Sequence, residues 1–195
     1  MASILIVCTG NICRSPLAEG FLRRALEQRT VGEEFDVSSA GTWGWEDSPA
    51  VPEAVGVGFE RGIDISGHVG RRLEPQYVDA VGLVLGMTSE HRAAAVQMVP
   101  GAEPKTFTLK ELVRLLDDLP ATGGDEQDLA GRIARAAGLR RSGFEGKPLD
   151  EDVVDPLGMP IDTYRAVAWE IEQFCERLAD GLVGKAPAQV ASGEE

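Results

Sequence analysis

Residues 4–16 read ILIVCTGNICRSP, and this stretch decides the fold. Its first four residues form a continuous apolar run, which predicts a strand that is buried on both faces. Such strands are typical of parallel sheets that are covered by helices. A glycine-containing loop follows, and apolar residues then recur on one stripe over residues 14–28, which predicts a long helix. The chain therefore opens as strand, loop and helix.

The same alternation continues along the chain. Further strands are predicted at residues 35–39, 80–85 and 105–107. Helices are predicted at residues 50–61 and 88–98, behind a capping box at 108–111, and at 161–182. Strands that alternate with helices indicate an α/β fold with a parallel sheet.

Two segments depart from this pattern. Residues 120–148 are rich in glycine and charge and contain one weak helical pattern, so we expect an insertion there. Residues 184–195 have no periodicity, which predicts a disordered tail. Residues 1–183 then form one domain, in keeping with the roughly 100–200 residues that a domain contains.

Charge and cysteine content narrow the class of protein. The chain has 195 residues, with 19 Lys and Arg against 32 Asp and Glu, and a formal net charge of −13. A nucleic-acid partner would need a basic face, so none is expected. Cys8, Cys13 and Cys175 are too few for a disulfide scaffold and lack the spacing of a zinc site. The first apolar run is too short for a signal peptide or a membrane span, so we expect a cytoplasmic protein with no membrane partner.

The loop at residues 8–16 carries the candidate chemistry. A loop that closes onto a helix start points several backbone N–H groups into one concavity, which suits an anion. Arg14, at the end of the loop, can bind two oxygens of a phosphate. Cys8 would lie at the floor of the same concavity, where the amide dipoles and Arg14 would stabilise a thiolate. A thiolate beneath a bound phosphoryl group is placed for in-line attack.

A nucleophile of this kind needs an acid for the leaving group. The candidate is Asp155, because Pro156 biases it toward an extended conformation that suits a carboxylate on a loop above a pocket. Asp152 is the nearest alternative. His91 falls in the first turn of a predicted helix and is expected to be solvated, whereas Cys175 falls on an apolar helical stripe and is expected in the core.

These residues resemble the low-molecular-weight protein tyrosine phosphatases, in which C-x5-R-S stands between a strand and a helix. The resemblance continues, in the same order, over most of the chain through residues 39–42 with Trp45, 61–68, 84–88 with His91, and 155–156 with Tyr164. It implies a three-layer sandwich around a four-stranded parallel sheet, with the phosphate loop between the first strand and the first helix. It also implies that the enzyme needs no metal and no cofactor.

The resemblance implies a role for each matching residue. Cys8 would form a phosphocysteine intermediate, Arg14 would bind the phosphate, and Asp155 would protonate the leaving oxygen. The phosphate loop would consist of Thr9, Gly10, Asn11, Ile12, Cys13, Arg14 and Ser15. Ser15 would also form a hydrogen bond with the sulfur of Cys8. A buried network would hold the loop in shape through Asn11, Ser15, Ser39 and His68. Cys13 would be able to form a reversible disulfide with Cys8.

The substrate pocket departs from the family at one wall. Its walls would include Thr9, Ile12, Trp45 and Leu157, and relatives carry an aromatic residue at the position of Leu157. Ile12 and Trp45 favour phosphotyrosine. A related branch that hydrolyses phosphoarginine prefers threonine at the position of Ile12, and Leu157 with Gly158 resembles that branch. Thr9 stands where many relatives have leucine.

The sequence therefore predicts a protein tyrosine phosphatase whose partner is a phosphorylated protein or peptide, with phosphate or another oxyanion bound in the loop. A protein arginine phosphatase of the same fold stays open. A module that binds phosphate or phosphopeptides without catalysis also stays open, although such a module would not need Asp155. An arsenate reductase is not favoured, because it would need redox cysteines where this chain has Gly86 and Met87.

Overall fold

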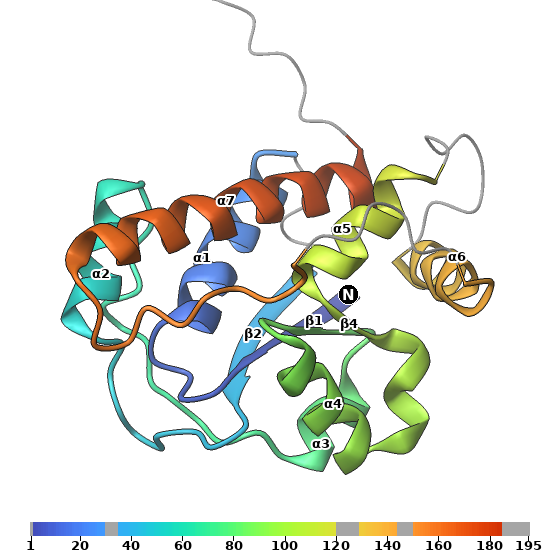
Figure 1. Ribbon diagram of the computed structural model, residues 1–195, viewed down its shortest axis with the longest axis horizontal. Helices are drawn as coiled ribbons and strands as arrows, with labels where there is room; N and C mark the ends of the chain where they lie inside the picture. The colour runs from blue at the N-terminus through green and yellow to red at the C-terminus, as the bar shows by residue number, and fades with distance from the viewer. Residues whose placement is uncertain (1, 30–34, 120–128, 144–149, 185–195) are drawn as a thin grey trace, which may run out of the picture.

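The computed structural model describes residues 2–29, 35–119, 129–143 and 150–184 (Figure 1). Within them, parallel strands form one sheet in the order β2-β1-β3-β4. The strands are β1 (Ala2–Cys8), β2 (Phe35–Gly41), β3 (Leu83–Gly86) and β4 (Thr106–Thr108). Helices cover both faces, so the predicted three-layer α/β sandwich is confirmed.

Strand β1 is buried on both faces, as its apolar run predicts. Side chains alternate along a strand, so consecutive residues enter different layers. Ile4 and Ile6 belong to the larger apolar cluster, and Leu5 and Val7 belong to a smaller cluster on the opposite face. This central strand therefore joins the two halves of the core and ends at the phosphate loop.

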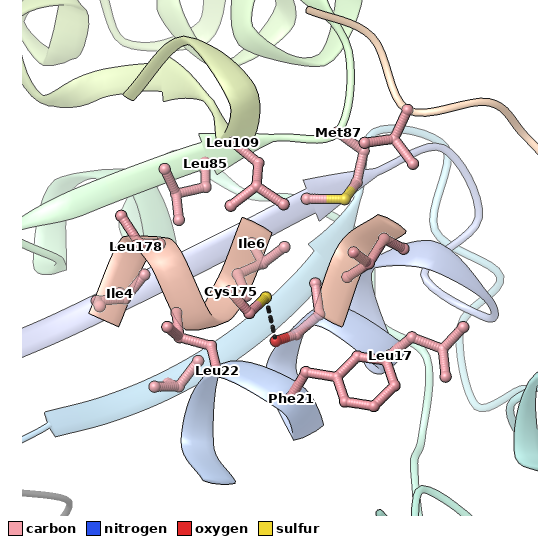
Figure 2. Packing of buried hydrophobic residues seen from close by; sticks show 14 of the residues in the cluster. Ile4, Ile6, Leu17, Phe21, Leu22, Leu85, Met87, Leu109, Cys175 and Leu178 are labelled. Carbon is pink, nitrogen blue, oxygen red and sulfur yellow. Dashed lines mark hydrogen bonds between the residues drawn. The ribbon is translucent and has the colours of Figure 1, made fainter. Parts of the chain in front are cut away.

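The helices divide between these two clusters. The larger cluster receives α1 (Arg14–Glu27), α2 (Pro52–Glu60), α5 (Leu109–Asp117), α6 (Leu129–Arg141) and α7 (Ile161–Val183). The smaller cluster receives α3 (Pro75–Ala80), α4 (Ser89–Met98) and the 3-10 helix η2 (Pro100–Lys105). Cys175 lies in the core as predicted, beside Leu22 and Leu178, and its thiol faces the carbonyl oxygen of Ala18 at 3.6 Å (Figure 2).

The strand order brings two loops together at one edge of the sheet. β1 lies between β2 and β3, and the helices that follow β1 and β3 cover opposite faces. Loops that diverge in this way leave a crevice at the carboxyl ends of the strands. The loop after Cys8 and the segment around Thr88, which begins α4, meet at this crevice.

The third predicted strand begins later in the structure than its pattern indicates. β3 begins at Leu83 instead of residue 80, because residues 75–80 form the short helix α3. The weak helical pattern within residues 120–148 corresponds to the helix α6, which buries Ile133 and Ala137. The Arg132 side chain of α6 donates a hydrogen bond to the carbonyl of Gly181 on α7. Residues 120–128, 144–149 and 185–195 lie outside the described residues, so the predicted insertion limits and tail stay predictions. In the described chain, each helix is too short or too polar to cross a membrane.

Candidate active site

The loop between β1 and α1 wraps around the sulfur of Cys8. Cys8 is 2% exposed. Asn11 has a φ of 56°, in the left-handed region that asparagine tolerates better than most residues. Its backbone N–H donates to Cys8 Sγ at 3.3 Å, and the Ser15 hydroxyl lies 2.9 Å from the same sulfur. Both groups can donate to a thiolate and stabilise it.

A polar network beneath the loop holds it in this shape. The Asn11 amide donates to Ser15 Oγ at 2.9 Å and to Ser39 Oγ at 2.8 Å. Asn11 Oδ1 accepts from the backbone N–H of Arg71, and His68 Nε2 donates to the Asn11 carbonyl at 2.7 Å. The four residues predicted to support the loop thus meet around Asn11, although His68 is half-buried.

Glu19 is a further member of this network that the sequence did not reveal. Its Oε2 accepts from the Ser39 hydroxyl at 2.7 Å. Ser15 and Glu19 stand four residues apart on α1, a spacing that places them on the same face of the helix. That spacing was the available signal, but it takes the fold to bring Ser39 beside them.

The end of β2 packs tightly against the loop at Gly41. A Cβ atom on Gly41 would lie 2.5 Å from the Thr9 carbonyl oxygen and 2.9 Å from the Asn11 nitrogen. Two residues further on, Trp43 donates its backbone N–H to the same Thr9 carbonyl at 3.0 Å. Glycine is therefore required for this close approach of strand and loop.

Arg14 and Asp155 form an ion pair over the loop. Arg14 is 4% exposed, and its Nη2 donates to Asp155 Oδ2 at 2.5 Å. Its Nη1 donates to the Val153 carbonyl at 3.0 Å, and Nη2 also faces Thr9 Oγ1 at 3.3 Å. Asp155 Oδ1 accepts from the backbone N–H of Leu157 at 3.2 Å. The segment after Val153 is thus fixed directly above Arg14.

Asp152, the alternative acid, faces a different group. Its Oδ1 accepts from the backbone N–H of Ser89 at 2.7 Å and its Oδ2 from the Ser89 hydroxyl at 3.3 Å. It therefore satisfies the start of α4 and is not among the residues that line the pocket.

A hollow that is open to solvent contains the candidate catalytic groups. The predicted catalytic and wall residues all line it: Cys8, Arg14, Asp155, Ile12, Trp45 and Leu157. Thr9, Gly10 and Cys13 line it as well. Asn11 and Ser15 lie beneath this lining and are fully buried. The structure thus brings the predicted nucleophile, the Arg14 cation, the predicted acid and apolar wall residues into one pocket.

The prediction that His91 is solvated is wrong. His91 is 5% exposed, with Nε2 2.9 Å from Thr9 Oγ1 and Nδ1 2.8 Å from Thr88 Oγ1. Burial lowers the pKa of His91 to about 4, with the nearby charge of Arg14 as the second cause, so the imidazole is neutral at pH 7. Helical periodicity could not reveal that the first turn of α4 faces the phosphate loop instead of water.

Cys13 is a buried thiol at the side of the pocket. Burial raises its pKa, and the proximity of Cys8 and Asp155 acts in the same direction. Cys8, Cys13 and Cys175 are all free in the structure. The disulfide between Cys8 and Cys13 therefore stays a prediction.

A model of the low molecular weight phosphotyrosine protein phosphatases matches residues 3–120. The chain belongs to this family. It is therefore a protein phosphatase, which is a hydrolase. The phosphate loop, the network around Asn11 and most of the sheet lie inside the matched segment, whereas Asp155 lies beyond it.

Relatives of the phosphatase carry two different activities in their names. The chain is 36% identical to a protein-arginine-phosphatase of Geobacillus stearothermophilus over 92% of this chain and 95% of that one. It is 40% identical to the low molecular weight protein-tyrosine-phosphatase Etp of Escherichia coli K12 over 54% of this chain and 67% of that one. A solved structure of the YwlE arginine phosphatase, a mutant with a phosphorylated active site serine, superposes with a TM-score of 0.69. It is 29% identical, and the match covers 92% of this chain and 95% of that chain.

Proposed function

We propose that this phosphatase acts in the cytoplasm on phosphotyrosine in proteins and peptides, through a phosphocysteine intermediate on Cys8. One observation carries the proposal: Cys8, Arg14 and Asp155 line the same pocket. The phosphorylated active site serine of the related YwlE structure supports a covalent phosphoryl intermediate. Free thiols throughout the chain support a reducing compartment.

In the first step the phosphoryl group is transferred to sulfur. The backbone N–H groups of the loop and the Arg14 guanidinium bind its non-bridging oxygens, so Arg14 exchanges Asp155 for the phosphoryl group. Cys8 Sγ attacks phosphorus, and an S–P bond forms as the bond to the tyrosine oxygen breaks. Asp155, protonated, gives its proton to that oxygen, which leaves as neutral tyrosine.

In the second step water releases phosphate. The Asp155 carboxylate now accepts a proton from water as the water oxygen attacks phosphorus. The S–P bond breaks, and Cys8 departs as a thiolate that receives hydrogen bonds from the Ser15 hydroxyl and the Asn11 N–H. The catalytic groups thus return to their starting charges, and inorganic phosphate leaves.

The walls of the pocket support phosphotyrosine as the substrate. Ile12, Trp45 and Leu157 present apolar surface that an aromatic ring can cover. Among the lining residues that the structure describes, Asp155 is the one carboxylate, so a phosphorylated guanidinium would have no second acid to pair with. A buried cation without such a partner is costly.

Phosphoarginine is the second candidate substrate. The relative that matches 92% of this chain is named a protein-arginine-phosphatase, whereas the named tyrosine phosphatase Etp matches 54%. Leu157 also leaves one wall without an aromatic ring. Both substrates use the same loop chemistry, so the choice depends on the slot and not on the nucleophile.

A side-by-side assay tests the proposal. Phosphate release is measured from two peptides of matched sequence, one with phosphotyrosine and one with phosphoarginine, and Cys8→Ser protein is the blank. We expect kcat/KM to be at least about tenfold higher for phosphotyrosine, the discrimination that one wall of an apolar slot supplies. A preference for phosphoarginine would overturn the substrate, and release no greater than the blank would overturn the mechanism.

A trapping experiment separates an enzyme from a binding module. Rapid acid quenching after mixing with phosphopeptide should leave one phosphoryl group on Cys8, located by mass spectrometry of the digested chain. A protein that only binds phosphopeptides gives no such adduct. Cys175→Ala is the matched control, because it removes a thiol from the core and leaves the pocket intact, so the adduct should persist.

A further inference from the structure

A chain of side-chain hydrogen bonds connects Arg14 to the start of α4. Arg14 Nη2 faces Thr9 Oγ1 at 3.3 Å, and Thr9 Oγ1 lies 2.9 Å from His91 Nε2. His91 Nδ1 lies 2.8 Å from Thr88 Oγ1, the residue that caps α4. Thr9 lines the pocket, whereas His91 lies behind it and is buried. The catalytic mechanism above uses neither side chain.

The direction of these hydrogen bonds follows from what each group can donate. A guanidinium only donates, so Thr9 Oγ1 accepts from Arg14. The Thr9 hydroxyl hydrogen then has His91 Nε2 as its acceptor, which assigns the ring hydrogen of neutral His91 to Nδ1. Nδ1 donates to Thr88 Oγ1. The bonds run in one direction from Arg14 to α4, an arrangement in which each bond polarises the next.

His91 sits on a firmly placed element. Its backbone N–H faces Thr88 Oγ1 at 3.4 Å, and Asp152 accepts from the backbone N–H of Ser89. Gly86 permits this closeness, because a Cβ there would lie 3.2 Å from His91 Cβ and 2.7 Å from the nitrogen of Arg92. The imidazole is therefore held by the end of β3 and the start of α4 in addition to its contact with Thr9.

We infer that Thr9 and His91 are positioning residues that orient the Arg14 guanidinium for phosphate. The inference rests on the proposed function in that phosphate replaces Asp155 at Arg14. Once Asp155 lets go, the Val153 carbonyl at Nη1 and Thr9 at Nη2 are the two remaining partners among those described for this guanidinium. Two partners on different nitrogens define the guanidinium plane, whereas one alone would let it rotate about a single bond.

Inorganic phosphate, titrated into the full chain by calorimetry, is the probe. Thr9→Val keeps the shape of the side chain and removes the hydroxyl, and His91→Leu removes both ring nitrogens. We expect each variant to weaken phosphate binding about tenfold, as loss of a hydrogen bond to a charged group would. Because the two residues act in series, the double variant should bind no more weakly than either single one. Thr9→Ser, which restores the hydroxyl, should recover affinity to within about threefold.

The controls separate positioning from folding. Gln97→Ala changes an exposed residue of α4 and should leave phosphate affinity unchanged. Unfolding midpoints without phosphate identify a variant that is merely unstable, and Thr9→Val tests the inference from the pocket side. Unchanged affinity in Thr9→Val, or a double variant about a hundredfold weaker than wild type, would overturn the inference. If wild-type protein binds phosphate but hydrolyses neither phosphopeptide, the proposed function fails and these variants still decide the inference.

Discussion

Asp155 uses its two carboxylate oxygens differently. Oδ1 accepts from the backbone N–H of Leu157, whereas Oδ2 pairs with Arg14. The first contact can persist while the second breaks, so the carboxylate can turn toward a leaving oxygen without leaving its loop. The same residue is thus a partner of Arg14 in the empty pocket, and under the proposed mechanism it is the proton donor in the occupied one.

Asp155→Asn should slow phosphocysteine formation by roughly 10²–10⁴, the usual contribution of general acid catalysis. Asparagine keeps the size of the side chain but cannot transfer the proton. The measurement is a single-turnover experiment with phosphotyrosine peptide. Asp152→Asn is the matched control, because that carboxylate bonds to Ser89 and does not line the pocket. Equal slowing in both variants would contradict the assignment.

Ile12→Thr should shift the substrate preference toward phosphoarginine. Ile12 is a buried part of the pocket wall, and threonine replaces apolar surface with a hydroxyl that can bond a guanidinium. We expect kcat/KM for phosphotyrosine to fall about tenfold, the usual value of such a change in an apolar slot. The ratio of kcat/KM for the two phosphopeptides is the readout. A ratio unchanged from wild type would show that Ile12 does not set specificity.

His91 should make the fold less stable as the pH falls. Its pKa is about 4 in the folded chain and near 6.5 when unfolded, so between these values the unfolded state binds more protons. Stability is complete above pH 6.5 and is lost toward pH 4, by on the order of 2–3 kcal/mol. Arg14 favours the neutral ring, whereas Asp155 and Asp152 oppose it. Urea unfolding at pH 7 and pH 4.5 should show a smaller acid loss for His91→Leu than for wild type, and equal losses would refute the prediction.

Single residues could be predicted from the sequence where a local pattern gave a chemical reason for their position. Cys8 and Arg14 end and begin adjacent elements, and Asp155 precedes a proline, so local pattern sufficed. His91 was wrongly expected to be solvated and Glu19 was not singled out, because their contacts are with residues far along the chain, Thr9 and Ser39 respectively. Helical periodicity states which face is apolar, but not what lies opposite a polar residue at a helix end.

At the scale of elements, the end of β2 packs closely against the phosphate loop and supports its shape. Gly41→Ala would place a Cβ 2.5 Å from the Thr9 carbonyl oxygen, and this oxygen belongs to backbone that cannot move away cheaply. We expect a stability loss of about 1–3 kcal/mol and a larger loss of kcat than of substrate affinity. Denaturant unfolding and steady-state kinetics measure the two effects.

Gly56→Ala is the control for Gly41→Ala. Gly56 lies inside α2, and a Cβ there would meet no atom within 4 Å. Alanine should therefore stabilise the helix by about 0.5–1 kcal/mol and leave activity unchanged. If both substitutions had the same effect on activity, the close packing of β2 on the loop would not explain the loss.

Elements were predictable where their pattern was long or carried a cap. The buried run of β1, the stripe of α1 and the capping box of α5 are all present, with Thr108 accepting from the Glu111 N–H at 3.0 Å. The helices α3 and η2 were not predicted, since each has six residues and is too short for a periodic signal. The late start of β3 follows from α3, which occupies residues that pattern alone assigned to the strand.

At the scale of the molecule, an ionic junction joins three helices on one face of the sheet. Glu172 of α7 accepts from Arg24 of α1 at 2.6 Å and from Arg61, at the end of α2, at 2.6 Å. These side chains are largely covered, and Glu172 is 14% exposed. The junction therefore fixes the long helix α7, which begins just after the segment that carries Asp155.

Glu172→Gln should destabilise the whole fold by about 2 kcal/mol, because the Arg61 guanidinium loses the Glu172 charge and Arg24 keeps only the more distant carboxylate of Glu176 at 3.8 Å. Thermal unfolding at low and high salt is the measurement. Glu60→Gln is the matched control: its partner Arg165 is exposed, so the unfolding midpoint should hardly change. Similar midpoints for both variants would show that the junction contributes no more than a surface pair.

The ion pair between Arg14 and Asp155 also means that the empty pocket already contains an anion. Any anion that binds to Arg14 must displace this carboxylate. A chloride or bicarbonate ion brings one negative charge and replaces a tethered carboxylate poorly, whereas a phosphate dianion brings more charge and several acceptor oxygens. Where weakly binding anions are abundant, we therefore expect the pocket to bind phosphate in preference to them. Its selectivity depends on the cost of displacing Asp155 from Arg14 as well as on the fit of the incoming anion.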